Sequence, residues 1–309
     1  MNNLVSQMIR KVPGSDLVCS RRGLPGRWID KLTGAYPELP AGLGSGMSRP
    51  HIFVGTHHKG GTVWMASTFH RLAHVNGFAF VRLNKQMKKW NYSPRKLEYF
   101  EAERQKLERA NDRPGVFFDY HSAMPDLSAC KASRGARGIH LVRDPRDMVI
   151  SAVRYHLKSD EAWLHVPDNR WGGMTYQEKL ASLNSFEDQI AFELDFNVRR
   201  TVRNMAGFND QGVFRNVRYE DLIVDEDMLL FHELCVWLGL GGMEIVQGLH
   251  AYWQYSIFGG MRKALESGGH GHISSGKPRQ WETKLSPSAL ELIQRELGTE
   301  IESLGYELV

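Results

Sequence analysis

The stretch that decides the fold is VGTHHKGGTVW, residues 54–64, which continues the apolar run HIF. Its first two glycines are separated by four residues, as in a phosphate-binding loop, but Gly61 stands where that loop carries lysine. The only lysine nearby, Lys59, comes two positions earlier, and Thr62 keeps the hydroxyl position. Glycines let backbone N–H groups approach a phosphate, and a helix that begins at Thr62 would add partial positive charge. The stretch predicts a phosphate-binding strand–loop–helix unit, although an ordinary glycine-rich turn gives the same pattern.

The rest of the chain alternates short apolar runs with helical patterns. The runs are HIFVGT (51–56), GVFFDY (115–120), GIHLVR (138–143) and GVFRNVRY (212–219). They are rich in β-branched and aromatic residues and are bounded by turn residues, which is typical of buried strands. Serine or aspartate followed by proline, at Pro94, Pro145 and Pro287, marks the start of three helices. The alternation predicts an α/β fold with a central parallel β-sheet flanked by helices on both faces.

A single domain is predicted over residues 51–309, preceded by an irregular N-terminal arm at residues 1–50. The part of the arm from residue 13 onward is rich in Gly and Pro and is weakly periodic. A long helical pattern from Tyr176 to Met205 belongs to the domain. In parallel sheets, ligands bind at the carboxyl ends of the strands, where the candidate residues of this chain stand.

The composition restricts the partners and the compartment that are expected for this chain. The 309 residues carry a net charge of only +4, so no nucleic-acid partner is expected. Cys19, Cys130 and Cys235 lie far apart and form neither a disulfide framework nor a metal-binding spacing, which favours a reducing compartment. The N-terminus lacks a signal-peptide pattern, and no apolar stretch reaches the length of a membrane span. We therefore expect a soluble, cytoplasmic protein.

A second candidate site is LVRDPRDMVIS, residues 141–151. Arg143 ends an apolar strand, a helix begins after Asp144, and Ser151 lies in the second turn of that helix. The planar fork of donors on arginine and a serine hydroxyl on the next helix can both reach one phosphate. A pairing of Arg143 with Asp144 or Asp147 at the helix start would explain the same residues without a ligand.

Together the two clusters resemble the sulfotransferases that use 3′-phosphoadenosine 5′-phosphosulfate (PAPS). That family binds the 5′-phosphosulfate with a Lys-Ser-Gly-Thr-Thr-Trp loop, and this chain has Lys-Gly-Gly-Thr-Val-Trp at residues 59–64. The family's Arg-(Asn/Asp)-Pro-(Lys/Arg)-Asp segment, with a serine eight residues beyond the arginine, resembles residues 143–151. Further resemblances, in the family's order, are VRYEDL (217–222), SIFGGM (256–261) and SGKPRQW (275–281). The resemblance covers roughly residues 51–309.

The resemblance implies a PAPS site that requires no metal ion. Its cofactor-binding residues would be Lys59, Gly60, Gly61, Thr62, Val63, Trp64, Arg143, Ser151, Tyr219, Ser275, Gly276 and Lys277. Two hydroxyl donors of the family are missing, because Gly60 replaces its serine and Val63 its second threonine. The family's Arg-Lys pair on the 3′-phosphate falls on the serines at 274–275, so Lys277 or Arg279 would supply that charge.

The resemblance also implies the reaction, which is transfer of a sulfuryl group to a small-molecule acceptor with a hydroxyl or amine. Lys59 would stabilise the charge that grows on the leaving phosphate oxygen. His121, just beyond the second predicted strand, aligns with the family's catalytic histidine and would take the proton of the acceptor. His57, His58 and His140 are competing candidates for this base.

The acceptor and two other functions stay open at this point. The aromatic segment at 161–176 could form a lid over a ring-containing or apolar acceptor, or an ordinary surface loop anchored by core tryptophans. The basic run at 84–96 could attract an anionic acceptor or be a solvated face. A P-loop nucleotide kinase would use Asp119 to hold Mg²⁺, and a non-catalytic nucleotide-binding relative would explain Gly60 and Val63. The sequence leaves the oligomeric state unknown.

Overall fold

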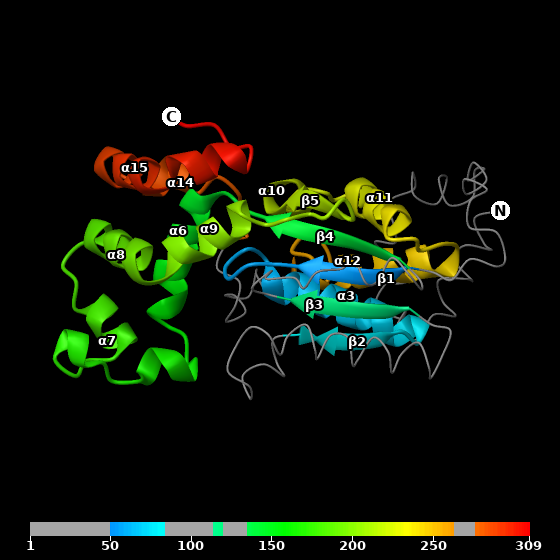
Figure 1. The fold of residues 1–309 in the computed structure, drawn as a ribbon, viewed down its shortest axis with the longest axis horizontal. Helices are drawn as coiled ribbons and strands as arrows, with labels where there is room; N and C mark the ends of the chain where they lie inside the picture. Colours follow the sequence, from blue (N-terminus) through cyan, green and yellow to red (C-terminus); the bar gives the residue numbers. More distant parts are fainter. Residues whose placement is uncertain (1–49, 84–113, 120–134, 263–275) are drawn as a thin grey trace.

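A five-stranded parallel sheet forms the centre of the computed structural model, which describes residues 50–83, 114–119, 135–262 and 276–309 (Figure 1). The strands are β1 (His51–Gly55), β2 (Ala79–Arg82), β3 (Gly115–Asp119), β4 (Ala136–Val142) and β5 (Phe214–Arg218). Their order across the sheet is β2-β3-β1-β4-β5, and every neighbouring pair is parallel. Every residue of β1 and β3 is buried, as their continuous apolar runs require.

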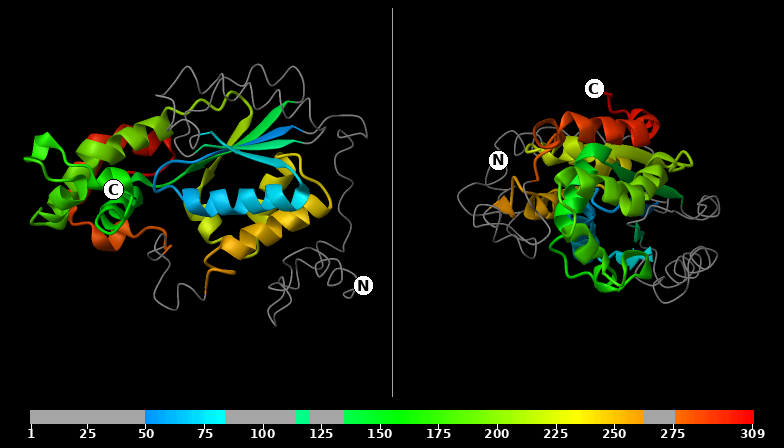
Figure 2. Two further views of the ribbon diagram at one scale, coloured as in Figure 1. Left: turned by 90° about the horizontal axis from the view of Figure 1, so that it is seen from below. Right: turned by 90° about the vertical axis from the view of Figure 1, so that its left-hand side faces the viewer.

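Helices cover one face of this sheet. They are α3 (Thr62–Asn76), α11 (Leu229–Trp237) and α12 (Met243–Tyr255). Figure 2 shows α3 and α12 side by side below the strands. The core there includes Phe231 and Tyr252, whose rings stack 4.1 Å apart. The other face carries a cluster that includes Phe53 and Phe117, and the helix predicted at residues 94–110 lies outside the described residues.

A second group of helices stands beyond the carboxyl ends of the strands, where the strand arrowheads point in Figure 1. Its members are α6 (Pro145–His156), the 3₁₀ helices η3 (Ala162–His165) and η4 (Asn169–Trp171), α7 (Tyr176–Ala181), α8 (Phe186–Glu193), the π-helical segment η5 (Leu194–Val198), α9 (Arg199–Ala206), α14 (Trp281–Lys284) and α15 (Pro287–Ser303). α10 (Tyr219–Ile223) directly follows β5. α6, α8, η5, α9 and α15 share a core in which Val149 packs with Ile190 and Ile293, whereas η3 and α7 pack with Phe192 of α8 in a smaller cluster. The carboxyl ends of the strands therefore face this second group of helices.

The α/β class and the central parallel sheet predicted from the sequence are confirmed. Strand β2 has no counterpart among the predicted strands, because AFVR is only four residues long and is half-buried at the edge of the sheet. The helical pattern predicted from Tyr176 to Met205 is interrupted, because the Ser185 side chain accepts the Asp188 N–H and starts a new helix. The predicted arm lies outside the described residues except for Pro50. No helix in the described ranges has the length and apolarity that crossing a membrane requires.

Candidate active site

The loop between β1 and α3 is organised by the carbonyl of His57. This oxygen accepts the Gly60 N–H at 2.9 Å and the Thr62 hydroxyl at 2.9 Å. The hydroxyls of Thr56 and Thr62 lie 3.1 Å apart. α3 then begins without a side-chain cap and without an acidic residue in its first turn. Its first N–H groups can therefore donate to an anion.

Gly61 shows why a lysine cannot follow the second glycine of this loop. Its φ of 95° lies in the left-handed region, which favours glycine. A Cβ at this position would stand 2.9 Å from Cδ2 of Tyr219 and 3.1 Å from Cδ2 of Leu141. Any other residue would therefore be strained and would collide with its neighbours. The packing of the loop against Tyr219 therefore accounts for the absence of lysine at position 61.

Lys59 itself occupies a strained position and a partly apolar environment. Its φ is 65°, which is uncommon for a residue with a side chain. The side chain is half-buried, and Nζ lies 3.4 Å from the centroid of the Tyr155 ring on α6. Burial, and secondarily the charge of Arg143, lower the pKa of Lys59 to about 7, against the opposing effects of Glu161 and Glu193. Strain and a perturbed pKa in one residue are typical of functional sites.

Arg143 connects the loop to the end of β4. Its NH1 donates to the Lys59 carbonyl at 2.8 Å, and its guanidinium lies 4.4 Å from the centroid of the Tyr219 ring. The Tyr219 hydroxyl donates to the Gly276 carbonyl at 3.4 Å. A Cβ on Gly276, whose φ is 63°, would stand 2.6 Å from the Ile257 side chain. The loop, the end of β4, α10 and the segment that follows residue 275 therefore meet.

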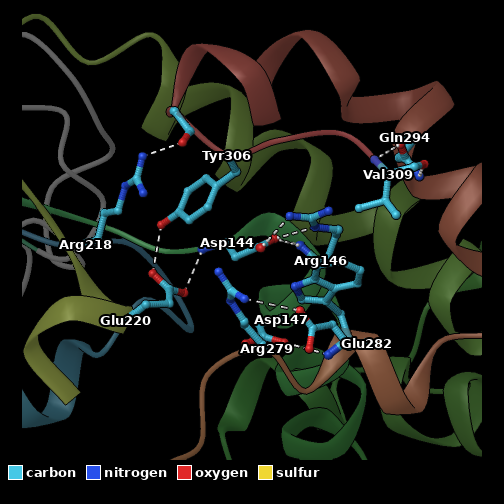
Figure 3. A network of polar contacts seen from close by, with 12 residues as sticks. Asp144, Arg146, Asp147, Arg218, Glu220, Arg279, Glu282, Gln294, Tyr306 and Val309 are labelled. Carbon is cyan, nitrogen blue, oxygen red and sulfur yellow. Dashed lines mark hydrogen bonds and ion pairs between the residues drawn. The ribbon is translucent and has the colours of Figure 1, made fainter. Parts of the chain in front are cut away.

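The start of α6 is held by a network of buried charges, shown in Figure 3. The Asp144 carboxylate accepts the Arg146 N–H at 2.9 Å and forms an ion pair with the Arg146 guanidinium at 2.8 Å. Glu220 accepts the Asp144 N–H at 3.0 Å and the Tyr306 hydroxyl at 2.9 Å, and burial raises its pKa. Asp144 is thus paired with Arg146. In the structure, Arg143 contacts the loop and Tyr219, and its charge also acts on Asp147.

A second part of the network attaches α14 to α6. The Asp147 carboxylate accepts the Trp281 N–H at 3.0 Å, and burial raises the pKa of Asp147. The Arg146 guanidinium lies 3.8 Å from the centroid of the Trp281 ring. Ser151 and Tyr155 follow Asp147 by four and eight residues, and Arg154 follows it by seven, so all four residues share one face of α6. That face is the one that contacts Lys59 and α14, which places the half-buried Ser151 between them.

The competing histidines lie in the loop, at His57 and His58, and in β4, at His140. Nε2 of His57 lies 2.8 Å from Nε2 of His140, and Nδ1 of His140 lies 2.7 Å from Oδ1 of Asn216. An amide oxygen accepts, so Nδ1 of His140 carries hydrogen and its Nε2 accepts from His57. Both histidines are almost fully buried, and burial lowers the pKa of His140 to about 4. The half-buried ring of His58 stacks on His156, with centroids 5.1 Å apart.

We expect His140 to make the protein less stable as the pH falls from about 6.5 to about 4. The pKa of His140 is lowered from 6.5 to about 4 in the folded state, so the unfolded chain binds the extra proton first. At about 1.4 kcal/mol per pKa unit, this contribution is about 3 kcal/mol, present above pH 6.5 and lost by pH 4. Urea unfolding at several pH values should show that the free energy of unfolding falls less between pH 6.5 and pH 4 for His140→Gln than for wild type. An identical pH dependence in both proteins would contradict this role.

The segment at 161–176 packs against the Lys59 side of α6. The Glu161 carboxylate accepts the Tyr155 hydroxyl at 3.0 Å and the Trp163 Nε1–H at 2.6 Å. Trp163 is 41% exposed, and its ring contacts that of Tyr176 at 5.0 Å. Trp171 is half-buried and packs against Tyr176 at 5.8 Å and Phe192 at 5.3 Å. Both tryptophans thus contact Tyr176, and Trp163 is the more exposed one, two residues from Glu161.

Two residues named from the sequence, His121 and Ser275, lie outside the described residues. The Val63 side chain is 53% exposed, and Trp64 stacks on Tyr252 with centroids 5.1 Å apart. Lys277 is exposed. The guanidinium of Arg279 is 3.7 Å from the Glu282 carboxylate, and its side chain is 75% exposed.

Two further residues near the site were not named from the sequence. Arg154 of α6 and Lys284 of α14 both donate to the side chain of Gln280. The basic segment around Trp281 is the only signal for them, and it does not reveal the partner on α6.

Comparisons with known proteins identify the family. The model of the sulfotransferase domain family matches residues 49–302. The fold is similar to that of mouse sulfotransferase SULT7A1 complexed with PAP, with a TM-score of 0.51 and 15% identity over 86% of this chain and 89% of that chain. A search of curated protein sequences finds no match.

Two more solved structures are similar at lower scores. The sulfotransferase domain of the Synechococcus PCC 7002 olefin synthase has a TM-score of 0.42 and 18% identity over 85% of this chain and 97% of that chain. The sulfotransferase domain of the curacin biosynthetic pathway has a TM-score of 0.42 and 17% identity over 85% and 100%. Because the family model spans most of its length, this chain belongs to the sulfotransferase domain family and is a sulfotransferase.

Proposed function

We propose that this enzyme takes a sulfuryl group from PAPS and transfers it to the hydroxyl or amine of a small-molecule acceptor by in-line displacement. The observation that carries the proposal is the chain of contacts from the Lys59 carbonyl through Arg143 and Tyr219 to Gly276. These contacts gather both predicted phosphate sites around the start of α3. The fold is similar to that of mouse SULT7A1, which is complexed with PAP, and this supports a nucleotide of that kind.

The loop and the start of α3 would hold the 5′-phosphosulfate. The hydroxyl of Thr62 already donates to the His57 carbonyl, so it stabilises the loop rather than the ligand. Gly60 and Val63 provide no hydroxyl. The donors that remain are the backbone N–H groups at the uncapped helix start and the ammonium of Lys59.

Lys59 would stabilise the leaving group. When bound, PAPS supplies a sulfuryl group whose bond to the 5′-phosphate oxygen breaks during transfer. The Lys59 ammonium would donate to that oxygen as negative charge grows on it. An anion in contact with Lys59 would raise the pKa of this lysine above 7 and keep it protonated. His121 is our candidate for the base that takes the acceptor proton.

The acceptor would bind on the side of Lys59 that faces Tyr155 and the segment 161–176. Glu161 fixes both Tyr155 and Trp163 by hydrogen bonds. Aromatic side chains held in this way favour a ring-containing acceptor. The hydroxyl or amine of such an acceptor would then point toward Lys59.

A nucleotide kinase is the weaker interpretation of the same loop. A kinase of this type needs lysine directly after the second glycine, and the packing of Gly61 against Tyr219 excludes a side chain there. Asp119 ends β3, where its carbonyl accepts the Thr56 N–H at 2.8 Å. The sulfotransferase family model spans the same residues, which leaves the kinase interpretation without support.

Calorimetry and a transfer assay test the proposal. We expect metal-free adenosine 3′,5′-bisphosphate to bind and to raise the melting temperature, because a ligand that binds only the folded state stabilises it by mass action. ATP with Mg²⁺ should have a much smaller effect. Labelled PAPS should then transfer sulfate to members of a panel of alcohols, phenols and amines. Preference for ATP would contradict the proposal, and the absence of transfer to every acceptor would favour a non-catalytic relative.

A further inference from the structure

Two cationic side chains converge on one neutral oxygen beside the proposed nucleotide site. NH1 of Arg154 on α6 donates to Oε1 of Gln280 at 3.0 Å, and Nζ of Lys284 on α14 donates to the same oxygen. Nε2 of Gln280 donates to the Lys277 carbonyl at 2.9 Å. Gln280 therefore holds the two cations together and also fixes the segment that carries Lys277.

Among the residues that the structure describes, no carboxylate is bonded to Arg154 or Lys284, so the arrangement concentrates positive charge. Burial lowers the pKa of Lys284, and the charges of Arg154 and Lys277 act in the same direction. Asp147 opposes this effect, but its carboxylate accepts backbone N–H groups, including that of Trp281 at 3.0 Å. An amide oxygen cannot neutralise two cations, so an anion at this point would relieve their repulsion. The two converging cations therefore supply the positive charge that an anion-binding site requires.

Arg154 and Lys284 lie near Ser151, which is predicted to bind the 3′-phosphate of the proposed cofactor. Asp147 contacts Trp281, and Arg154 contacts Gln280, two turns further along α6. Ser151 lies between these two contact points on the same face of α6. The family's Arg-Lys pair is missing from this chain, and the exposed Arg279 stands 3.7 Å from the carboxylate of Glu282.

We propose that Arg154 and Lys284, held together by Gln280, provide the positive charge that binds the 3′-phosphate of the nucleotide beside Ser151. This inference rests on the proposed use of PAPS. The guanidinium fork of Arg154 would donate to two phosphate oxygens, and the ammonium of Lys284 would donate to the third. Specificity for a nucleotide with a 3′-phosphate over one without it then comes from α6 and α14, and not from the positions where the family carries its Arg-Lys pair.

The test compares two nucleotides that differ only in the 3′-phosphate. Calorimetry would measure the Kd of adenosine 3′,5′-bisphosphate and of adenosine 5′-monophosphate for wild type, Arg154→Gln, Lys284→Gln and the double variant. We expect about a tenfold loss of bisphosphate affinity for each single variant and about a hundredfold loss for the double variant. The affinity for the monophosphate should change less than about twofold, because that nucleotide lacks the group these residues bind. Arg295→Gln removes an equal charge from the exposed face of α15 and should change neither affinity.

The outcomes separate this inference from the proposed function. If wild type binds both nucleotides equally or neither of them, the proposed use of PAPS fails. If wild type prefers the bisphosphate and the variants keep the same preference, the function stands and the role of Arg154 and Lys284 is overturned. An equal loss of affinity for both nucleotides would also overturn it, because it would show a general effect on the site. Melting temperatures of all variants identify any loss of fold.

Discussion

Replacing Lys59 by methionine is expected to lower the turnover number about 100- to 1000-fold, the range found when a donor to a developing oxyanion is removed. Methionine keeps the length of the side chain and its contact with the Tyr155 ring, where Nζ now lies 3.4 Å from the centroid. It removes only the charge and the hydrogen-bond donor. The KM for PAPS should change much less than the turnover number, because the charge on the leaving oxygen is largest in the transition state. Steady-state kinetics with labelled PAPS would measure both.

Lys59→Gly is the matched variant that separates backbone strain from side-chain chemistry. Lys59 has a φ of 65°, and glycine relieves about 1–2 kcal/mol of strain at such a position. Glycine also destabilises the protein by about 0.5–1 kcal/mol, because it gives the unfolded chain more conformational freedom. The free energy of unfolding should therefore be equal or slightly higher. Turnover should fall as far as in Lys59→Met. Normal turnover in either variant would contradict the role of the ammonium.

Much of the fold was predictable from the sequence because its central strands are buried on both faces. HIFVG and GVFFD are continuous apolar runs, and a parallel sheet is the arrangement that buries such runs. The proximity of Lys59 to Arg143 was also predictable, because the carboxyl ends of neighbouring parallel strands meet at one edge. In the structure β1 pairs with β4, and NH1 of Arg143 reaches the Lys59 carbonyl.

The remaining features of the site depend on contacts that no local pattern encodes. Arg154 and Gln280 are 126 residues apart in the sequence and meet only because α14 packs on α6. The bond between His57 and His140 joins a loop to a strand 83 residues away. Each of these residues alone looks like an ordinary polar residue of a helix, loop or strand. Packing of distant elements decides their roles, and the sequence shows only that such side chains are available.

Gly61→Ala is expected to destabilise the protein by about 2–5 kcal/mol and to abolish binding of adenosine 3′,5′-bisphosphate. A φ of 95° costs an L-residue about 1–2 kcal/mol. The new Cβ would also stand 2.9 Å from Cδ2 of Tyr219, and overpacking of this kind adds about 1–3 kcal/mol. Binding should be lost because a displaced Tyr219 ring would no longer support Arg143, whose guanidinium lies 4.4 Å from the ring centroid. Urea unfolding and calorimetry would measure the two effects.

Gly172→Ala is the control for the backbone part of this cost. Gly172 has a φ of 66°, and a Cβ there would meet nothing within 4 Å. Gly172→Ala should lower the free energy of unfolding by only about 1–2 kcal/mol, which is the cost of the left-handed conformation. It should leave nucleotide binding unchanged. The difference between the two variants then measures the contact of position 61 with Tyr219. Equal costs in both variants would show that this contact does not exclude a side chain, and the explanation for the displaced lysine would fail with it.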